Sequence, residues 1–81
     1  MRLPLIKHAT KFVEEADIDY ILETIEVLEH MFEARGIKDE ELDVLGEIVS
    51  NLYGAVEVDK MMKEGKSQKE ALNEFMKRVT L

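Results

Sequence analysis

Residues 39–65 read DEELDVLGEIVSNLYGAVEVDKMMKEG and predict one long helix against which the rest of the chain packs. Apolar side chains recur there at alternating steps of three and four residues, a spacing that keeps them on one face of a helix. The members of this stripe are Leu42, Leu45, Val49, Leu52 and Val56, widened by Ile48, Ala55 and Met62. Asp39 is a suitable N-cap for this helix, and Gly65 is a suitable end.

A second row in the same segment consists of small residues at i, i+4 and i+8. A glycine inside a helix costs about 1 kcal/mol relative to alanine, so close approach of another backbone is the natural compensation. That backbone can belong to the first or last helix of the chain, or to the long helix of a second copy related by a two-fold axis. We favour the second copy, with an interface formed by Gly46, Ser50, Tyr53, Gly54, Val58 and Met61.

Two amphipathic helices are expected before the long one. Pro4 suits a first helical turn, and residues 4–15 carry an apolar face. The apolar pattern then shifts by roughly 140° in phase, so one straight helix cannot bury both faces against one core. We therefore expect a break at Asp17 or Asp19, either of which can cap a second helix over residues 18–35.

The end of the chain carries the clearest local signal in the sequence. Ser67-Gln68-Lys69-Glu70 is a capping box, in which a serine and a glutamate bond each other's free backbone N–H groups and open a helix over residues 68–79. The sequence thus predicts a single all-α domain over residues 1–81. Its architecture is a small four-helix bundle built on an antiparallel helical hairpin of residues 18–35 and 40–64.

Composition narrows the class of protein. Apolar residues make up 46% of the 81 residues and charged residues 36%, which indicates a folded domain and not a disordered tail. There is no cysteine and no long uninterrupted apolar run, so we expect a cytoplasmic protein without a membrane segment. Abundant Glu and Lys with a single Pro and no Trp also resemble the proteins of heat-adapted organisms.

A chain of this length buries only roughly 60 to 65 per cent of its surface on folding, so its core is thin. Four apolar residues exceed what such a small bundle can cover: Val27, Val44, Val58 and Met61. A homodimer is therefore expected.

No constellation of residues predicts an enzyme. Glu23, Glu26, His30 and Glu33 share one side of the second helix, but the Glu–His spacing of four and the lack of a counterpart elsewhere favour a solvated acidic face over a metal site. The serines are expected inside a helix and at a cap, both far in sequence from the two histidines. We predict no catalytic residue, no metal and no cofactor.

The charge is unevenly distributed along the chain. Residues 1–59 hold 5 Lys/Arg against 15 Asp/Glu, whereas residues 60–81 hold 6 against 3. The basic segment 60–78 resembles a helix-turn-helix, with cations at Lys63, Lys66, Lys69, Lys77 and Arg78. The net charge of −7 and three glutamates in the segment argue against phosphate binding.

The function that the sequence favours is a non-enzymatic protein–protein interaction or scaffold module. It would work in the cytoplasm as a homodimer, with or without a further protein partner. The alternative is a DNA-associated transcriptional regulator that uses residues 60–78.

Overall fold

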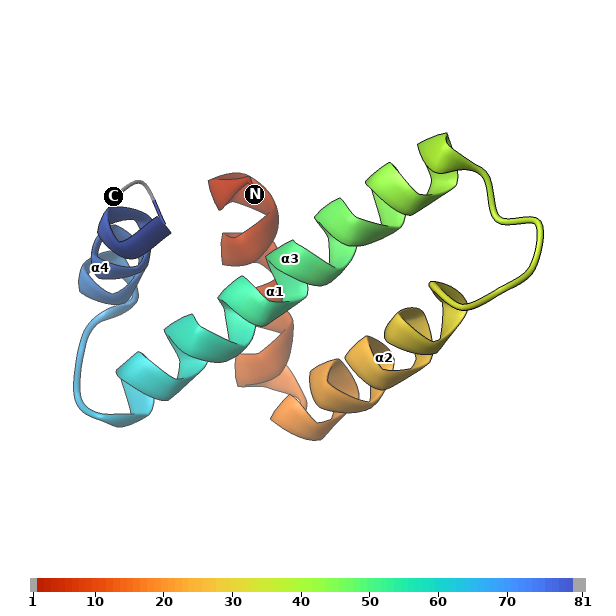
Figure 1. Cartoon of the computed structure of the whole chain (residues 1–81). Coiled ribbons are helices and arrows are strands. Elements are labelled where there is room, and N and C mark those ends of the chain that lie inside the picture. Colours follow the sequence, from red (N-terminus) through yellow and green to blue (C-terminus); the bar gives the residue numbers. More distant parts are fainter. Residues whose placement is uncertain (1, 80–81) are drawn as a thin grey trace.

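The computed structural model describes residues 2–79 and contains, over that range, four helices packed against one another and no β-strand (Figure 1). The helices are α1 (Leu3–Glu15), α2 (Ile18–Met31), α3 (Asp39–Lys63) and α4 (Gln68–Val79). The all-α fold predicted from the sequence is confirmed. The long helix α3 runs through Gly54 without a break, as expected from its apolar spacing.

Most helix ends follow the predicted capping signals. Pro4 lies in the first turn of α1. Asp17 caps α2, where its Oδ1 accepts a hydrogen bond of 2.9 Å from the Asp19 backbone N–H. At the start of α4, the Glu70 N–H donates to Ser67 Oγ at 3.2 Å, and Glu70 Oε1 accepts from Ser67.

The connection between α2 and α3 differs from the prediction. Helix α2 ends at Met31 instead of residue 35, because the next N–H groups bond three residues back, as Phe32 does to Glu29 and Glu33 to His30. Gly36 has a positive φ of 80° and lies in the turn that follows the helix. The N-cap of α3 is Lys38 and not Asp39.

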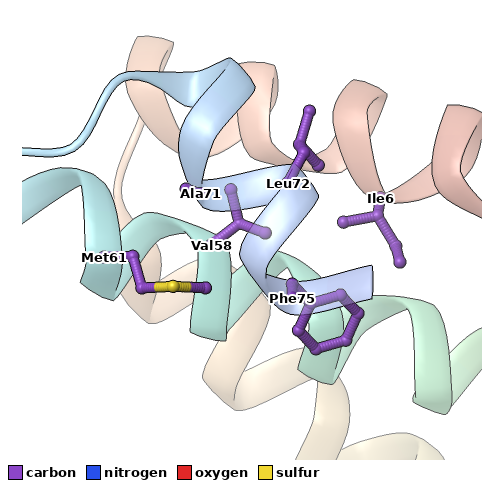
Figure 2. Close-up of a cluster of buried hydrophobic side chains, with 6 residues drawn as sticks. All are labelled: Ile6, Val58, Met61, Ala71, Leu72 and Phe75. Atoms are coloured by element: carbon purple, nitrogen blue, oxygen red, sulfur yellow. The ribbon is translucent and has the colours of Figure 1, made fainter. Parts of the chain in front are cut away.

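Helix α3 buries two opposite sides, not one. Val49 belongs to a first core cluster with Val13, Ile21 and Ile25, here called the α2-side cluster. Val58 follows Val49 by nine residues, which is about two and a half helical turns at roughly 100° per residue. Its side chain therefore points to the opposite side of α3. It belongs to the α4-side cluster, drawn in Figure 2, which consists of Ile6, Val58, Met61, Ala71, Leu72 and Phe75.

Two expectations are therefore wrong. Val58 and Met61, predicted as surplus apolar surface, are 0% and 3% exposed inside the chain's own core. The face they occupy was missed because the stripe through Val49 accounts for only one side of the helix. Ile48, predicted to widen that stripe, is exposed.

Helix α1 crosses α3 at Gly54 and joins the two clusters. It contributes Ile6 to the α4-side cluster and Val13 to the α2-side cluster. A Cβ atom added at Gly54 would lie 2.8 Å from Ile6 Cδ1 and 3.2 Å from Phe75 Cε2, so a larger residue would push these two side chains aside. At Gly46, in contrast, an added Cβ meets nothing within 4 Å.

The molecule is thin, with principal extents of 44 × 29 × 16 Å. In one direction it is little thicker than a single helix with its side chains, so many apolar side chains have no layer above them. Over the described part of the chain, no helix has both the length and the apolar character that crossing a membrane requires.

The two helical glycines allow a matched test of the crossing. We expect Gly54→Ala to lower the free energy of unfolding by about 1 kcal/mol, because the overpacking of Ile6 and Phe75 outweighs the gain in helix propensity. Gly46→Ala should raise it by about 0.5–1 kcal/mol, because only the gain applies there. Urea denaturation followed by circular dichroism measures both. Equal stabilisation by the two substitutions would contradict the crossing at Gly54.

Candidate protein-interaction surface

An apolar groove lies where α2 and α3 approach their connection. It has a volume of about 410 Å³ and is open to solvent. Its lining residues come from the end of α2, the connection and the first three turns of α3: Met31, Ile37, Glu40, Glu41, Val44, Leu45 and Ile48. We call it the tip groove.

The apolar side chains of the tip groove sit on the flanks of two helices. Val44 and Ile48 are four residues apart on α3 and are 60% and 43% exposed. Val27 and Met31 are four apart on α2 and are 62% and 47% exposed. Residues four apart share a helix side, and Met31 meets Val44 and Ile48 in the groove, so the two pairs face the same side of the α2–α3 pair.

The groove exists because α1 covers only part of this flank of α3. Asn51 follows Val44 by seven residues, two helical turns, and so lies on the same side of α3. Asn51 is buried, and its Oδ1 accepts a hydrogen bond of 2.8 Å from the Arg2 N–H at the start of α1. Two turns earlier on α3, no residue of α1 lines the groove, and Val44 stays exposed.

The end of the molecule that holds the tip groove is strongly acidic. Residues 18–49 contain 10 Asp/Glu against 2 Lys/Arg, and the polar residues that line the groove are Glu40 and Glu41. Glu41 accepts the Lys38 N–H at 3.0 Å and so also caps α3. The surface is thus an apolar floor with carboxylates at its edge.

The six predicted interface residues do not form one surface. Gly54, Val58 and Met61 are enclosed by side chains of their own chain, because α1 and α4 pack on that side of α3. Gly46 and Ser50 are half-buried. Tyr53 is exposed, and its hydroxyl donates a 2.9 Å hydrogen bond to Glu29 Oε2. This bond raises the pKa of Tyr53, since deprotonation would break it and place two negative charges together.

The sequence indicated part of the groove. Met31 and Val44 of the lining, and Val27 one turn before Met31, stand outside the core stripes in the sequence and are exposed in the structure. Ile37, which also lines the groove, is not among the predicted interface residues. An isoleucine between Gly36 and Lys38 was the available signal, since loops favour polar residues.

The acidic face of α2 does not assemble a metal site. All four of its candidate ligands are exposed, and the one contact among them that the structure gives is a 3.8 Å approach of His30 Nδ1 to Glu33 Oε2. Within residues 2–79, no three His, Asp or Glu side chains are placed to hold a metal ion together.

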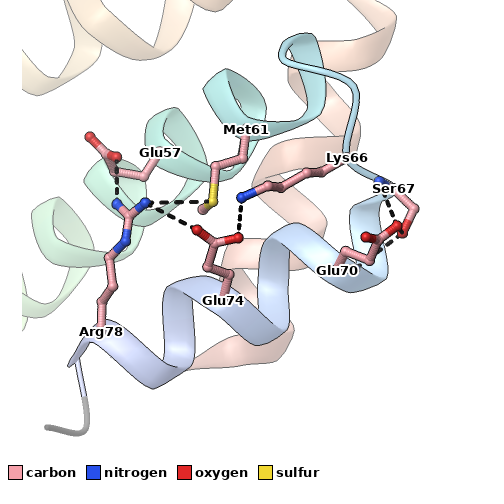
Figure 3. A network of polar contacts seen from close by, with 7 residues as sticks. All are labelled: Glu57, Met61, Lys66, Ser67, Glu70, Glu74 and Arg78. Carbon is pink, nitrogen blue, oxygen red and sulfur yellow. Dashed lines mark hydrogen bonds and ion pairs between the residues drawn. The ribbon is translucent and has the colours of Figure 1, made fainter.

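Several cations of the basic segment 60–78 pair with carboxylates of the same chain, and Figure 3 draws the pairs of Lys66 and Arg78. Lys66 Nζ pairs with Glu74 Oε2, and Arg78 lies 3.5 Å from both Glu57 and Glu74. Lys63 Nζ lies 3.0 Å from Asp59 Oδ2 in the preceding turn. These pairs reduce the positive potential that a nucleic-acid surface requires.

A second hollow of about 530 Å³ lies between the starts of α1 and α4. Leu3, Pro4 and Leu72 form its apolar part, and Leu72 belongs to the α4-side cluster. Lys7 and Lys69 are the charged residues of its lining, so its edge is basic where that of the tip groove is acidic.

The pair of Lys66 and Glu74 predicts a pH dependence of stability. The Lys66 hydrogen bond, followed by the charges of Lys66 and Arg78, lowers the pKa of Glu74 in the folded chain. A carboxylate with a lowered folded pKa stabilises above its unfolded pKa, and this stabilisation is lost as the pH falls through the folded pKa. Glu74→Gln should therefore have a lower Tm than the wild type at pH 7.

The difference should disappear well below pH 4, where the wild-type carboxyl is protonated as well. Thermal melts at pH 7 and about pH 2.5 measure it. Glu26→Gln, at an exposed position of α2, is the control and should not lower the Tm at pH 7. A deficit of Glu74→Gln that persisted in acid would point to lost packing instead of lost charge.

Comparison with known proteins places the chain in a family without assigning a role. No curated protein and no solved structure matches the chain. The profile described as "Family of unknown function (DUF6952)" matches residues 1–81, and the chain belongs to this family.

Proposed function

We propose that this protein is a non-enzymatic, cytoplasmic protein–protein interaction module that binds through the tip groove, presented by an antiparallel hairpin of α2 and α3. The observation that carries the proposal is the set of exposed apolar side chains from both helices on one side: Val27, Met31, Val44 and Ile48. Exposed apolar groups gathered in a groove with a polar edge are typical of protein-binding surfaces.

Energetics support an interaction of moderate strength. Covering an apolar side chain that is about half exposed recovers roughly 1 kcal/mol by the relation between buried area and free energy. Four such side chains supply a few kcal/mol before the entropic cost of association is subtracted. A transient partner fits this range better than an obligate complex.

DNA-associated regulation through residues 60–78 is the less supported alternative. Lys63, Lys66 and Arg78 each lie against a carboxylate of the chain, which competes with a DNA phosphate for the same cation. Salt-sensitive retention of the protein on heparin would favour this alternative over the interaction module.

The groove is tested by removing its apolar surface without adding charge. Val44→Ser/Ile48→Ser should fold, with a free energy of unfolding within about 1 kcal/mol of the wild type, because both side chains are already exposed. In capture experiments from the native cytosol, the variant should lose a protein that the wild type retains. Leu22→Ser is the matched control, because Leu22 is exposed on α2 but does not line the groove.

Capture of the same proteins in the same amounts by Val44→Ser/Ile48→Ser and by the wild type would refute the groove as the binding surface. Loss of the captured protein with Leu22→Ser as well would indicate a general effect on folding. Circular dichroism of both variants separates these two results.

A homodimer is the second candidate. The observation that favours it concerns Gly46. A Cβ added there would meet nothing within 4 Å, so no close contact within the chain compensates for the cost of a glycine inside the helix. Approach of a second copy to Gly46 and Ser50 would supply the missing contact. Light scattering at micromolar concentration should then give twice the 9.4 kDa of one chain, and Gly46→Leu should reduce the mass to a single chain. A wild-type mass of one chain would contradict the dimer.

A further inference from the structure

We infer that the occupant of the tip groove is a short basic amphipathic helix of another protein. The inference rests on the proposed function and adds to it the chemical class of the partner. Three properties of the groove carry it, namely its secondary structure, its length and its charge.

The walls of the groove require side-chain recognition. They are the flanks of α2 and α3, whose backbone groups are bonded within each helix, so they offer no free edge to which a strand could add. Parallel ridges of side chains from two helices leave a furrow that accepts the ridge of a third helix. A helix that docks there would lie beside α1, which already occupies the same flank of α3 at Asn51.

The length of the groove sets the size of the partner helix. On α3 the lining runs from Glu40 to Ile48, which at 1.5 Å per residue is about 12 Å. A helix of two to three turns spans this distance. Its apolar residues would recur at i, i+3, i+4 and i+7 and meet Met31, Val44 and Ile48.

Charge selects a basic helix. The 10 acidic and 2 basic residues of segment 18–49 give this end of the molecule a net charge of −8, more than the −7 of the whole chain. Arg35 and Lys38, the two cations, lie in the connection. Lys and Arg beside the apolar stripe of the partner would meet Glu40 and Glu41 at the edge of the groove.

The same charge argues against a second copy in this groove. A two-fold contact through the groove would place two ends of net charge −8 against each other, and like charges across an interface are unfavourable. A head-to-tail contact with the basic hollow between α1 and α4 would satisfy the charges. In a head-to-tail assembly, however, the groove of the last copy stays free. The assembly closes only if the rotation between copies produces a ring, and otherwise it grows into a filament.

The test titrates the full-length chain with three labelled peptides of about 18 residues, long enough to form helix. The first is a Leu/Lys peptide with leucine at i, i+3, i+4 and i+7. The second has the same leucine pattern with glutamate in place of lysine, and the third is a shuffled Leu/Lys peptide without an apolar stripe. Fluorescence anisotropy is measured at 0.15 M salt, where charges more than about 8 Å apart are largely screened.

We expect saturable one-to-one binding of the patterned Leu/Lys peptide, at least about tenfold tighter than of the other two peptides. Val44→Ser/Ile48→Ser should weaken it by about tenfold or more, because the anchors lose their apolar contacts. Glu40→Gln should weaken it by about two- to fivefold, the effect of one exposed charge pair. Glu26→Gln removes the same charge from an exposed position outside the groove lining and should have a smaller effect.

Three results would overturn the inference. They are equal binding of the Leu/Glu peptide, equal binding of the shuffled peptide, and binding that survives Val44→Ser/Ile48→Ser. A groove-dependent partner without a basic amphipathic helix, or a dimer that Val44→Ser/Ile48→Ser dissociates, would also overturn it while leaving an interaction role in place. If the patterned Leu/Lys peptide does not bind and the groove variant captures the same proteins as the wild type, both proposals fail.

Discussion

The contact of Ile6 with Gly54 holds the four helices in one body. Ile6 is fully buried, and its side chain and the Phe75 ring both lie close to the position that a Cβ at Gly54 would occupy. The close approach brings α1 onto α3 next to α4, whose Phe75 reaches the same glycine. Because α1 also contributes Val13 to the α2-side cluster, this one crossing ties together two small cores that share few other elements.

Two small cores in place of one large core explain the exposed surface. Helix α3 packs against α2 on one side near its start and against α1 and α4 on the other sides further along. Its N-terminal half therefore lacks the cover that α1 gives to Asn51. The apolar flank that remains, together with the matching flank of α2, forms the tip groove. The candidate binding surface is thus a direct result of where α1 crosses.

The charges are arranged in two different ways at the two ends. At the α4 end, cations and carboxylates pair with each other, as Lys66 and Arg78 do with Glu74, and the pair of Arg78 with Glu57 links α4 to α3. At the tip, the 10 carboxylates of segment 18–49 greatly outnumber its 2 cations. Unbalanced charge next to apolar surface does not stabilise the fold. It attracts a partner of opposite charge to this surface.

The amino-acid sequence by itself determined the four helices and most of their ends. These depend on local physics: the spacing of apolar residues, the caps at Asp17 and Ser67, and the left-handed turns at Gly36 and Gly65. The predicted end of α2 at residue 35 is wrong because the helix tightens and stops at Met31, with four residues between its end and Gly36.

Only the tertiary structure decided which helix faces are covered. Gly46 and Gly54 have the same local signal, but one has open space around it and the other lies under Ile6. Val44 and Val58 are equally apolar, but one is 60% exposed and the other fully buried. Periodicity shows which residues share a side of a helix, and it carries no information about which neighbouring helix, if any, packs against that side. The core residues on the second side of α3, and with them the position of the groove, depend on contacts between segments far apart in the chain.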